Sequence, residues 1–174
     1  PPASLVRAPP LGLFHLWRGA CTCGRGSRAS ARLRPGGGGG SLWDVGVYPL
    51  SLAQFLMGGP PEWVFGDQWL GPSGVDEAFT GTLHYANGAM AQISSGFAVP
   101  YYNHFDALGD NGRLLFTRPF TGLESDDRRL TYYDSDHAAH ELPVPEMELY
   151  AGEVEDMHDA ILNGRPTYVT LAEN

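Results

Sequence analysis

Residues 36–40 are all glycine, and they open directly into a segment with the pattern of a helix. Apolar residues recur from residue 45 onward at the spacing of one helix face. Gly58-Gly59, followed by two prolines, is a strong signal for a helix C-terminus. We therefore predict a helix from about Val45 to Gly58. Pro49 would lie in its first turn, where the missing N–H costs nothing.

Asp44 and Tyr48 lie four residues apart at the start of this predicted helix, so they would share one face. A free tyrosine titrates near pH ~10 and exchanges protons at neutral pH only where its phenolate is stabilised. The helix N-terminus favours negative charge, whereas Asp44 repels it unless that carboxylate holds a nearby cation. Lysine would serve, but the chain has none. Taken alone, the pair is better explained by Asp44 as a helix cap and Tyr48 as a core residue.

The segment at 38–49, GGGSLWDVGVYP, resembles the start of the second domain of the Gfo/Idh/MocA oxidoreductases, the family of glucose–fructose oxidoreductase and inositol dehydrogenase. Shorter likenesses at 56–64, 81–89, 107–114 and 147–173 extend the resemblance over residues 36–174. The resemblance implies an N-terminal Rossmann domain that binds NAD or NADP. It also implies a C-terminal domain, built on a large open sheet, that provides the substrate pocket and the oligomer interface.

The same resemblance implies roles for two residues. Tyr48 would exchange a proton with a substrate hydroxyl, and Asp44 would be its supporting carboxylate. Tyrosine at this position favours the sugar and dihydrodiol dehydrogenase branch of the family. The function implied is hydride transfer to or from a sugar or polyol carbon, and an NAD-dependent glycosidase of the same family or a non-catalytic dimerising domain is the alternative.

Two family motifs are not found in the chain. No G-x-G-x-x-G precedes the glycine run in a strand–turn–helix context, and without lysine there can be no Glu-Lys-Pro motif. We therefore interpret the chain as a C-terminal part truncated at both ends and expect it to be inactive by itself. NAD or NADP would be bound mainly by the missing N-terminal domain.

Charge divides the chain near the glycine run. Residues 1–35 contain six arginines and no acidic residue, whereas residues 36–174 contain five arginines and twenty acidic residues, for a total of −9. The arginines have no helical period and no aromatic stacking platform, which argues against a nucleic-acid or membrane partner. The bias toward Arg, Pro, Gly, Ala, Ser and Cys is typical of out-of-frame reading of a GC-rich gene. We therefore predict that residues 1–35 are a frame-shifted or disordered segment.

The rest of the chain has the pattern of a mainly antiparallel sheet. Two strong hairpin signals, Asn87-Gly88 and Asn111-Gly112, join strands of alternating polarity, and helices are expected only at the start and the end. The predicted class is α+β, an open sheet with helices on one face. The other apolar face of such a sheet needs cover, and the family resemblance implies that a second subunit provides it, giving a homodimer or homotetramer. Strands are predicted at residues 62–69, 77–85, 89–97, 104–109, 113–117, 130–133 and 138–142, and a last helix carries an apolar stripe at residues 147, 150, 154, 157 and 161.

Three further residues are candidates for substrate binding. Tyr101 and Asn103 lie in a polar link between two predicted strands and could bind sugar hydroxyls, although a plain polar loop is the alternative. Trp43 could stack on a sugar ring or lie in the core. The acidic and histidine-rich segment at 134–140 offers possible metal ligands, but a solvated hairpin turn explains it better, so no metal site is predicted. With both cysteines in the doubtful segment and no long apolar run, we expect a cytoplasmic protein.

Overall fold

A computed structural model describes residues 11–24, 31–120, 128–144 and 150–167. These residues divide into two compact units. The first holds all the strands and helix α2 (Val47–Met57), and the second holds helix α3 (Ala151–Asn163). None of the described helices is long and apolar enough to cross a membrane.

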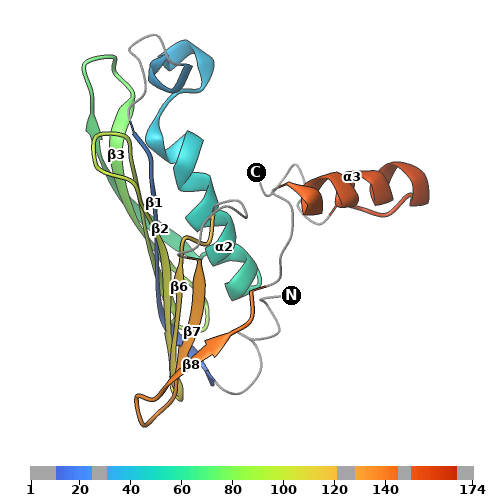
Figure 1. Cartoon of the computed structure of the whole chain (residues 1–174). Coiled ribbons are helices and arrows are strands. Elements are labelled where there is room, and N and C mark those ends of the chain that lie inside the picture. Colours follow the sequence, from blue (N-terminus) through green and yellow to red (C-terminus); the bar gives the residue numbers. More distant parts are fainter. Residues whose placement is uncertain (1–10, 25–30, 121–127, 145–149, 168–174) are drawn as a thin grey trace. The chain divides into compact units, whose positions relative to one another are not determined.

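The first unit is an eight-stranded open sheet with α2 lying along one of its faces (Figure 1). Neighbouring strands are antiparallel except β1 and β4, which run parallel. The predicted α+β class and mainly antiparallel sheet are therefore confirmed. In spatial order the strands are β2 (Trp63–Leu70), β3 (Asp76–His84), β4 (Met90–Gly96), β1 (Phe14–Thr22), β5 (Tyr102–Gly109), β6 (Gly112–Thr117), β7 (Arg129–Tyr133) and β8 (Ala139–Leu142).

The hairpins follow the turn residues in the sequence. Between β3 and β4, Gly88 has φ +81°, a left-handed conformation that glycine adopts at no steric cost. The side-chain oxygen of Asn87 accepts a hydrogen bond of 3.0 Å from the backbone N–H of Ala89 and closes the turn. In the β5–β6 hairpin, Gly109 pairs with Gly112 next to the turn. These local signals explain why both hairpins could be predicted.

The prediction that residues 1–35 are frame-shifted or disordered is wrong for the described part of that segment. Strand β1 lies in the middle of the sheet, paired with β4 on one side and β5 on the other. Its side chains alternate: Trp17 is fully buried, whereas Arg18 is exposed on the opposite face. The residues around Trp17 follow the strand period of two, so the missing helical period does not indicate disorder. The domain boundary predicted at residue 36 is also wrong, because β1 belongs to the same sheet as the strands that follow residue 36.

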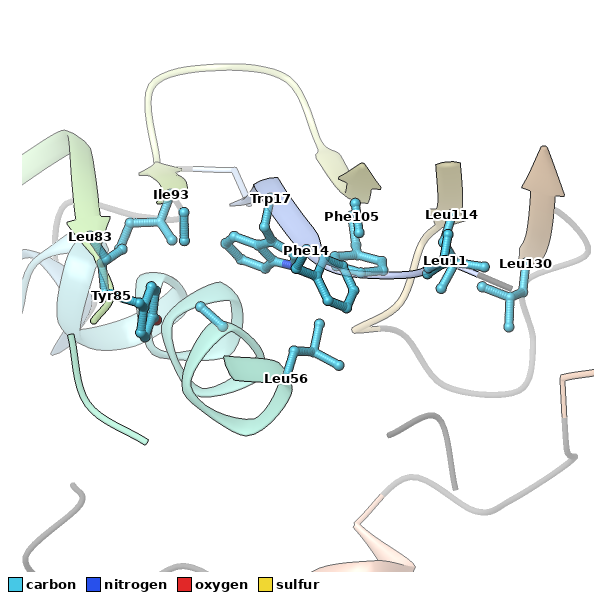
Figure 2. Close-up of a cluster of buried hydrophobic side chains, with 13 residues drawn as sticks. Leu11, Phe14, Trp17, Leu56, Leu83, Tyr85, Ile93, Phe105, Leu114 and Leu130 are labelled. Atoms are coloured by element: carbon cyan, nitrogen blue, oxygen red, sulfur yellow. The ribbon is translucent and has the colours of Figure 1, made fainter. Parts of the chain in front are cut away.

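The core lies between the sheet and α2 (Figure 2). Ala53 and Leu56 project from α2 onto the sheet, and the ring of Trp17 lies 5.7 Å from that of Phe105 on the next strand. A β-carbon at Gly19 would overlap the Trp17 ring, so glycine leaves the space that the indole fills. The buried core side chains include Leu11, Phe14, Trp17, Leu56, Leu83, Tyr85, Ile93, Phe105, Leu114 and Leu130.

The helix begins earlier than predicted. A π-helical turn, Leu42–Gly46, runs into α2 without a break, so Pro49 and Tyr48 lie inside a continuous helical segment. A proline inside a helix clashes with the carbonyl group four residues before it, here that of Val45. The wider π turn lies at this carbonyl and relieves the clash. Tyr48 is therefore not at a free, positively polarised helix N-terminus, contrary to the prediction.

Helix α3 forms the described part of the second unit and ends at Asn163. Gly164 follows with φ +63°, the left-handed residue that commonly ends a helix. The spacing of Val154, Met157 and Ile161 places them on one face, as the stripe predicts. Met147, the first residue of that stripe, lies outside the described residues.

Candidate active site

The glycine run forms a tight loop against the short segment before it. Gly40 donates its N–H to the carbonyl oxygen of Arg32 at 2.9 Å, and Gly39 donates to that of Arg34 at 3.1 Å. A β-carbon at Gly39 would lie only 2.7 Å from both carbonyl oxygens. Gly38, with φ +73°, adopts a left-handed conformation. Sterics therefore require glycine at the end of the run and explain the sequence there.

An internal carboxylate occupies the N-terminus of the helix that follows. Asp76 of β3 accepts hydrogen bonds from the Ser41 hydroxyl at 2.7 Å and from the Leu42 N–H at 2.8 Å, both through Oδ2. Its other oxygen lies where a β-carbon at Gly40 would be. Helix N-termini commonly bind phosphate, but here the negative charge of the protein itself satisfies that end.

Asp44, in the π-helical turn, forms an ion pair with Arg32. The two side chains meet at 3.1 Å between Arg32 Nε and Asp44 Oδ2 and are both partly exposed. Arg32 also donates through Nη1 to the sulfur of Cys23 at 3.2 Å. The cation that pairs with Asp44 is thus not a lysine but an arginine, from the segment before the glycine run.

The two thiols beside this ion pair are not activated. Burial, with smaller contributions from Cys23 and Asp44, raises the pKa of Cys21 to about 11. Burial also raises the pKa of Cys23, against the opposing effect of the Arg32 guanidinium. Both cysteines are therefore thiols at neutral pH, and the nucleophilic thiolate form is disfavoured.

Tyr48 is the second residue of α2 and is 39% exposed. Its ring stacks on Phe120, with centroids 5.7 Å apart and planes at 25°. The interpretation of Tyr48 as a core residue therefore does not hold, because neighbouring Pro49, and not Tyr48, is buried. Asp44 and Tyr48 lie on one helical segment, but their ion-pair and stacking contacts go to different partners, Arg32 and Phe120.

Tyr101 and Asn103 are brought together at the start of β5. The Asn103 side-chain amide donates to the Tyr101 hydroxyl at 3.2 Å, and the guanidinium of Arg118 lies 5.6 Å above the Tyr101 ring. These side chains line a hollow of about 420 Å³. The plain-loop alternative does not describe Asn103, which is a buried strand residue. The described lining residues are Tyr101, Tyr102, Asn103, Thr117, Arg118 and Arg129.

Trp43 is separate from these contacts. Its side chain is 68% exposed, and its indole nitrogen lies 3.3 Å from where a β-carbon of Gly38 would be. The core alternative for Trp43 is therefore wrong. Its exposed ring remains available for stacking on a ligand.

The helix start and the hollow lie at the same end of the sheet. Cys21 of β1 pairs in register with Ser95 on one side and with Asn103 on the other. The charge of Asp44 acts on the Cys21 thiol, so the ion pair lies close to the same strand end. Phe120, which stacks on Tyr48, is two residues beyond Arg118 of the hollow. The candidate residues thus gather around the ends of β1, β4 and β5.

Sequence reasoning missed Arg32, Arg118 and Phe120. The pairing of Arg32 could have been predicted, because Asp44 requires a nearby cation and an arginine serves as well as a lysine. Arg118 and Phe120 follow β6 in a segment without periodicity, so no local signal placed them near Tyr48. Their position depends on how β5 and β6 pair.

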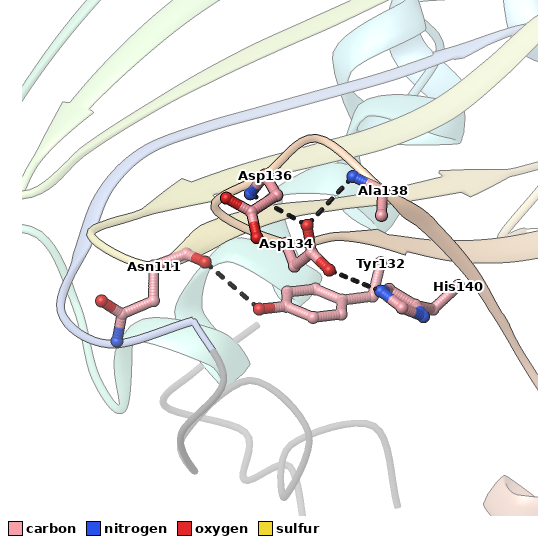
Figure 3. A network of polar contacts seen from close by, with 6 residues as sticks. All are labelled: Asn111, Tyr132, Asp134, Asp136, Ala138 and His140. Carbon is pink, nitrogen blue, oxygen red and sulfur yellow. Dashed lines mark hydrogen bonds and ion pairs between the residues drawn. The ribbon is translucent and has the colours of Figure 1, made fainter.

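The acidic segment at 134–140 forms the turn between β7 and β8 (Figure 3). One oxygen of Asp134 accepts hydrogen bonds from the N–H groups of Asp136 and Ala138, and the other lies 2.7 Å from His140 Nε2. The hydrogen bond from His140, together with those from the backbone, holds the pKa of Asp134 below its usual range. The segment is a hairpin turn, as predicted, and the Asp134 carboxylate is hydrogen-bonded within it.

Comparison with known proteins identifies the same family as the sequence motifs. The sequence model of the GFO/IDH/MocA C-terminal domain matches residues 3–115. The match includes β1, so the segment expected to be frame-shifted is part of the family domain.

Named relatives are sugar oxidoreductases. The chain is 29% identical over 143 residues to D-xylose 1-dehydrogenase (NADP(+)) 2 of Haloferax volcanii, covering 82% of this chain and 44% of that protein. It is 30% identical over 129 residues to dTDP-3,4-didehydro-2,6-dideoxy-alpha-D-glucose 3-reductase of Actinomadura kijaniata, covering 73% and 38%. The chain therefore spans less than half the length of these relatives.

Solved structures show the same fold. Aldose-aldose oxidoreductase from Caulobacter crescentus, complexed with glycerol, superposes with a TM-score of 0.83 at 22% identity, covering 98% of this chain and 52% of that one. A 3-ketoreductase from Actinomadura kijaniata, in complex with NADP and TDP-benzene, superposes with a TM-score of 0.81 at 23% identity, covering 94% and 50%.

Proposed function

The chain belongs to the GFO/IDH/MocA oxidoreductase family, and from this premise we propose that it forms the substrate-binding side of an NAD(P)-dependent oxidoreductase acting on a sugar or polyol. The names of its relatives, a xylose dehydrogenase and a deoxysugar reductase, support this substrate class. The observation that carries the proposal is the position of Tyr48, half-exposed at the sheet end where the Arg32–Asp44 ion pair also lies.

In this proposal Tyr48 takes a proton from the substrate hydroxyl during oxidation and returns it during reduction. The nicotinamide cofactor, when bound, supplies the hydride chemistry. Asp44 and Arg32 fix the electrostatic surroundings of the phenol as a pair. Tyr101 and Asn103 bind substrate hydroxyl groups, and the exposed indole of Trp43 stacks on a sugar ring.

The described residues do not fit a dinucleotide. The helix N-terminus after the glycine run, a position where phosphate often binds in other proteins, already holds the Asp76 carboxylate. A phosphate there would meet a like charge and lose the Leu42 N–H as a donor. We therefore propose that NAD or NADP is bound mainly by a nucleotide-binding domain outside this chain.

Two measurements test this assignment. Calorimetry with NAD and NADP on the chain alone should give no measurable binding. When the chain is joined to a Rossmann domain, a panel of sugars and polyols should include one that reduces NAD or NADP, followed by absorbance of the reduced cofactor. Micromolar cofactor binding by the chain alone would contradict the division of roles, and a panel without any turnover would contradict the function.

The ion pair gives a second prediction. In the same joined protein, Arg32→Ala should lower kcat by roughly twofold to fivefold, because a partly exposed ion pair contributes at most about 1 kcal/mol. Arg32→Lys keeps the charge and should recover part of the loss, whereas the neighbouring Arg34→Ala should leave kcat unchanged. Steady-state kinetics with a melting curve for each variant makes the check. A loss that Arg32→Lys does not reduce at all would assign Arg32 a purely structural role.

We also propose that the chain self-associates through the sheet face opposite α2. In register, Trp63, Phe65 and Trp69 of β2 lie on one face with Met90 of β4, and all four are exposed. Large exposed apolar patches of this kind mark interaction surfaces. Opposed copies of the face would form a homodimer, and a second contact would form a homotetramer.

Sedimentation equilibrium tests the self-association. The chain should behave as a dimer or tetramer at micromolar concentration, and Phe65→Asp should shift it toward monomer, because a charge would then lie in the contact. Trp43→Asp, an equally exposed aromatic position outside this face, is the matched control. A chain that sediments as a monomer over a wide concentration range would rule out the interface.

A further inference from the structure

The hollow at the start of β5 has a chemical character beyond general sugar binding. Its described lining combines two guanidinium groups, Arg118 and Arg129, with hydroxyl groups and one amide, and contains no carboxylate. This is unusual in a chain with a net charge of −9. Guanidinium groups match the geometry of phosphate and carboxylate oxygens and can bind them through two parallel hydrogen bonds.

One buried acceptor on a residue that lines this hollow lacks a donor among the described residues. Asn103 is only 6% exposed, and its amide N–H₂ donates to the Tyr101 hydroxyl. Its other polar atom, Oδ1, has no hydrogen-bond partner among the described residues. A buried acceptor without a donor is costly, so such atoms are normally satisfied by a partner or a ligand. A hydroxyl group of a bound sugar is a donor of the required kind.

The two arginines are held at the hollow by their backbones. Arg118 has φ +51°, a left-handed conformation uncommon for residues other than glycine, and its N–H donates to the Asn103 carbonyl oxygen at 3.0 Å. Arg129 is exposed, and its N–H donates to the Thr117 hydroxyl at 3.0 Å. These bonds fix where each side chain starts, and both arginines line the hollow.

We propose that the hollow binds the anionic group of a negatively charged sugar, either a phosphate or a carboxylate. Arg118 and Arg129 contact the anion, and Asn103 Oδ1 accepts a hydrogen bond from a sugar hydroxyl. The proposal rests on the proposed function and narrows its substrate class from sugars in general to sugar phosphates or sugar acids. Phe120, two residues after Arg118 in the sequence, stacks on Tyr48 and so links the hollow's segment to the proposed proton-transfer residue.

Ligand-observed NMR titration of the full chain tests the inference without cofactor or turnover. The probes are glucose, glucose 1-phosphate and glucuronate. At least one anionic probe should bind tenfold to a hundredfold more tightly than glucose, the effect of charge-assisted hydrogen bonds. Arg129→Gln, which removes the guanidinium charge of an exposed side chain and keeps a polar group, should remove most of this difference. Arg165→Gln, an exposed arginine in the second unit, should not.

The three probes separate the possible results. A gain for glucose 1-phosphate alone identifies phosphate as the recognised group, and a gain for glucuronate identifies carboxylate. Glucose binding as tightly as both anions, or an anionic preference that survives Arg129→Gln, would overturn the inference and leave the sugar-binding role intact. No binding of any probe would overturn both.

Discussion

Replacing Tyr48 with phenylalanine should lower kcat by roughly 10²- to 10⁴-fold, in a protein that joins this chain to a nucleotide-binding domain, and should leave sugar binding nearly unchanged. The substitution removes only the transferable proton, because phenylalanine keeps the ring that stacks on Phe120. Tyr48 is 39% exposed, so loss of its hydroxyl leaves no large buried void. Steady-state kinetics, with a sugar dissociation constant measured separately, makes the test.

The control for Tyr48→Phe is the melting temperature of the same variant, which should not change. Asp44→Asn keeps the shape of the carboxylate but breaks the ion pair with Arg32, and it should lower kcat by less than Tyr48→Phe. Full turnover by Tyr48→Phe would remove the proton-transfer role from this residue. Unfolding of the variant would instead make Tyr48 a structural residue.

The largest effect on stability is expected for Trp17→Ala. Its side chain is completely buried between β1 and α2, and truncation of a buried tryptophan destabilises a protein by about 3–5 kcal/mol. Because Trp17 lies in the segment that composition alone marks as disordered, the same measurement tests whether β1 is part of the folded sheet. Urea denaturation followed by circular dichroism gives the change in unfolding free energy.

Trp43→Ala is the matched control for Trp17→Ala, since it removes the same side chain from a position that is 68% exposed. It should change the unfolding free energy by less than about 0.5 kcal/mol, the usual range for surface substitutions. Equal effects at the two tryptophans, or none at Trp17, would show that β1 does not belong to the folded core.

The parts of the fold that could be predicted are those with local signals. The β3–β4 turn carries Asn87-Gly88, and α2 ends at Gly58 in a left-handed conformation, as expected from the paired glycines. Strand β1 has no such signal, because its partners β4 and β5 lie far away in the sequence. The composition of this segment favours disorder, whereas the alternation of exposed and buried residues around Trp17 favours a strand.

The residues of the candidate site also differ in whether a local signal could predict them. Asp44 and Tyr48 could be proposed because they lie within one short motif. The carboxylate of Asp76 at the helix start, and the arginine that pairs with Asp44, come from other segments and depend on tertiary contacts. The π-helical turn could not be predicted either, because it differs from an α-helix only in how the turn accommodates Pro49.

The central position of β1 also affects how the chain is made. In the finished sheet Leu16 pairs with Met90 on one side and with Leu108 on the other. Strand β1 leaves the ribosome before β4 and β5, so it stays unpaired until both neighbours have been synthesised. During this interval the apolar face and both edges of β1 are exposed, so the strand can bind chaperones or aggregate. Slow translation after residue 24 would lengthen this exposure and lower the yield of folded protein.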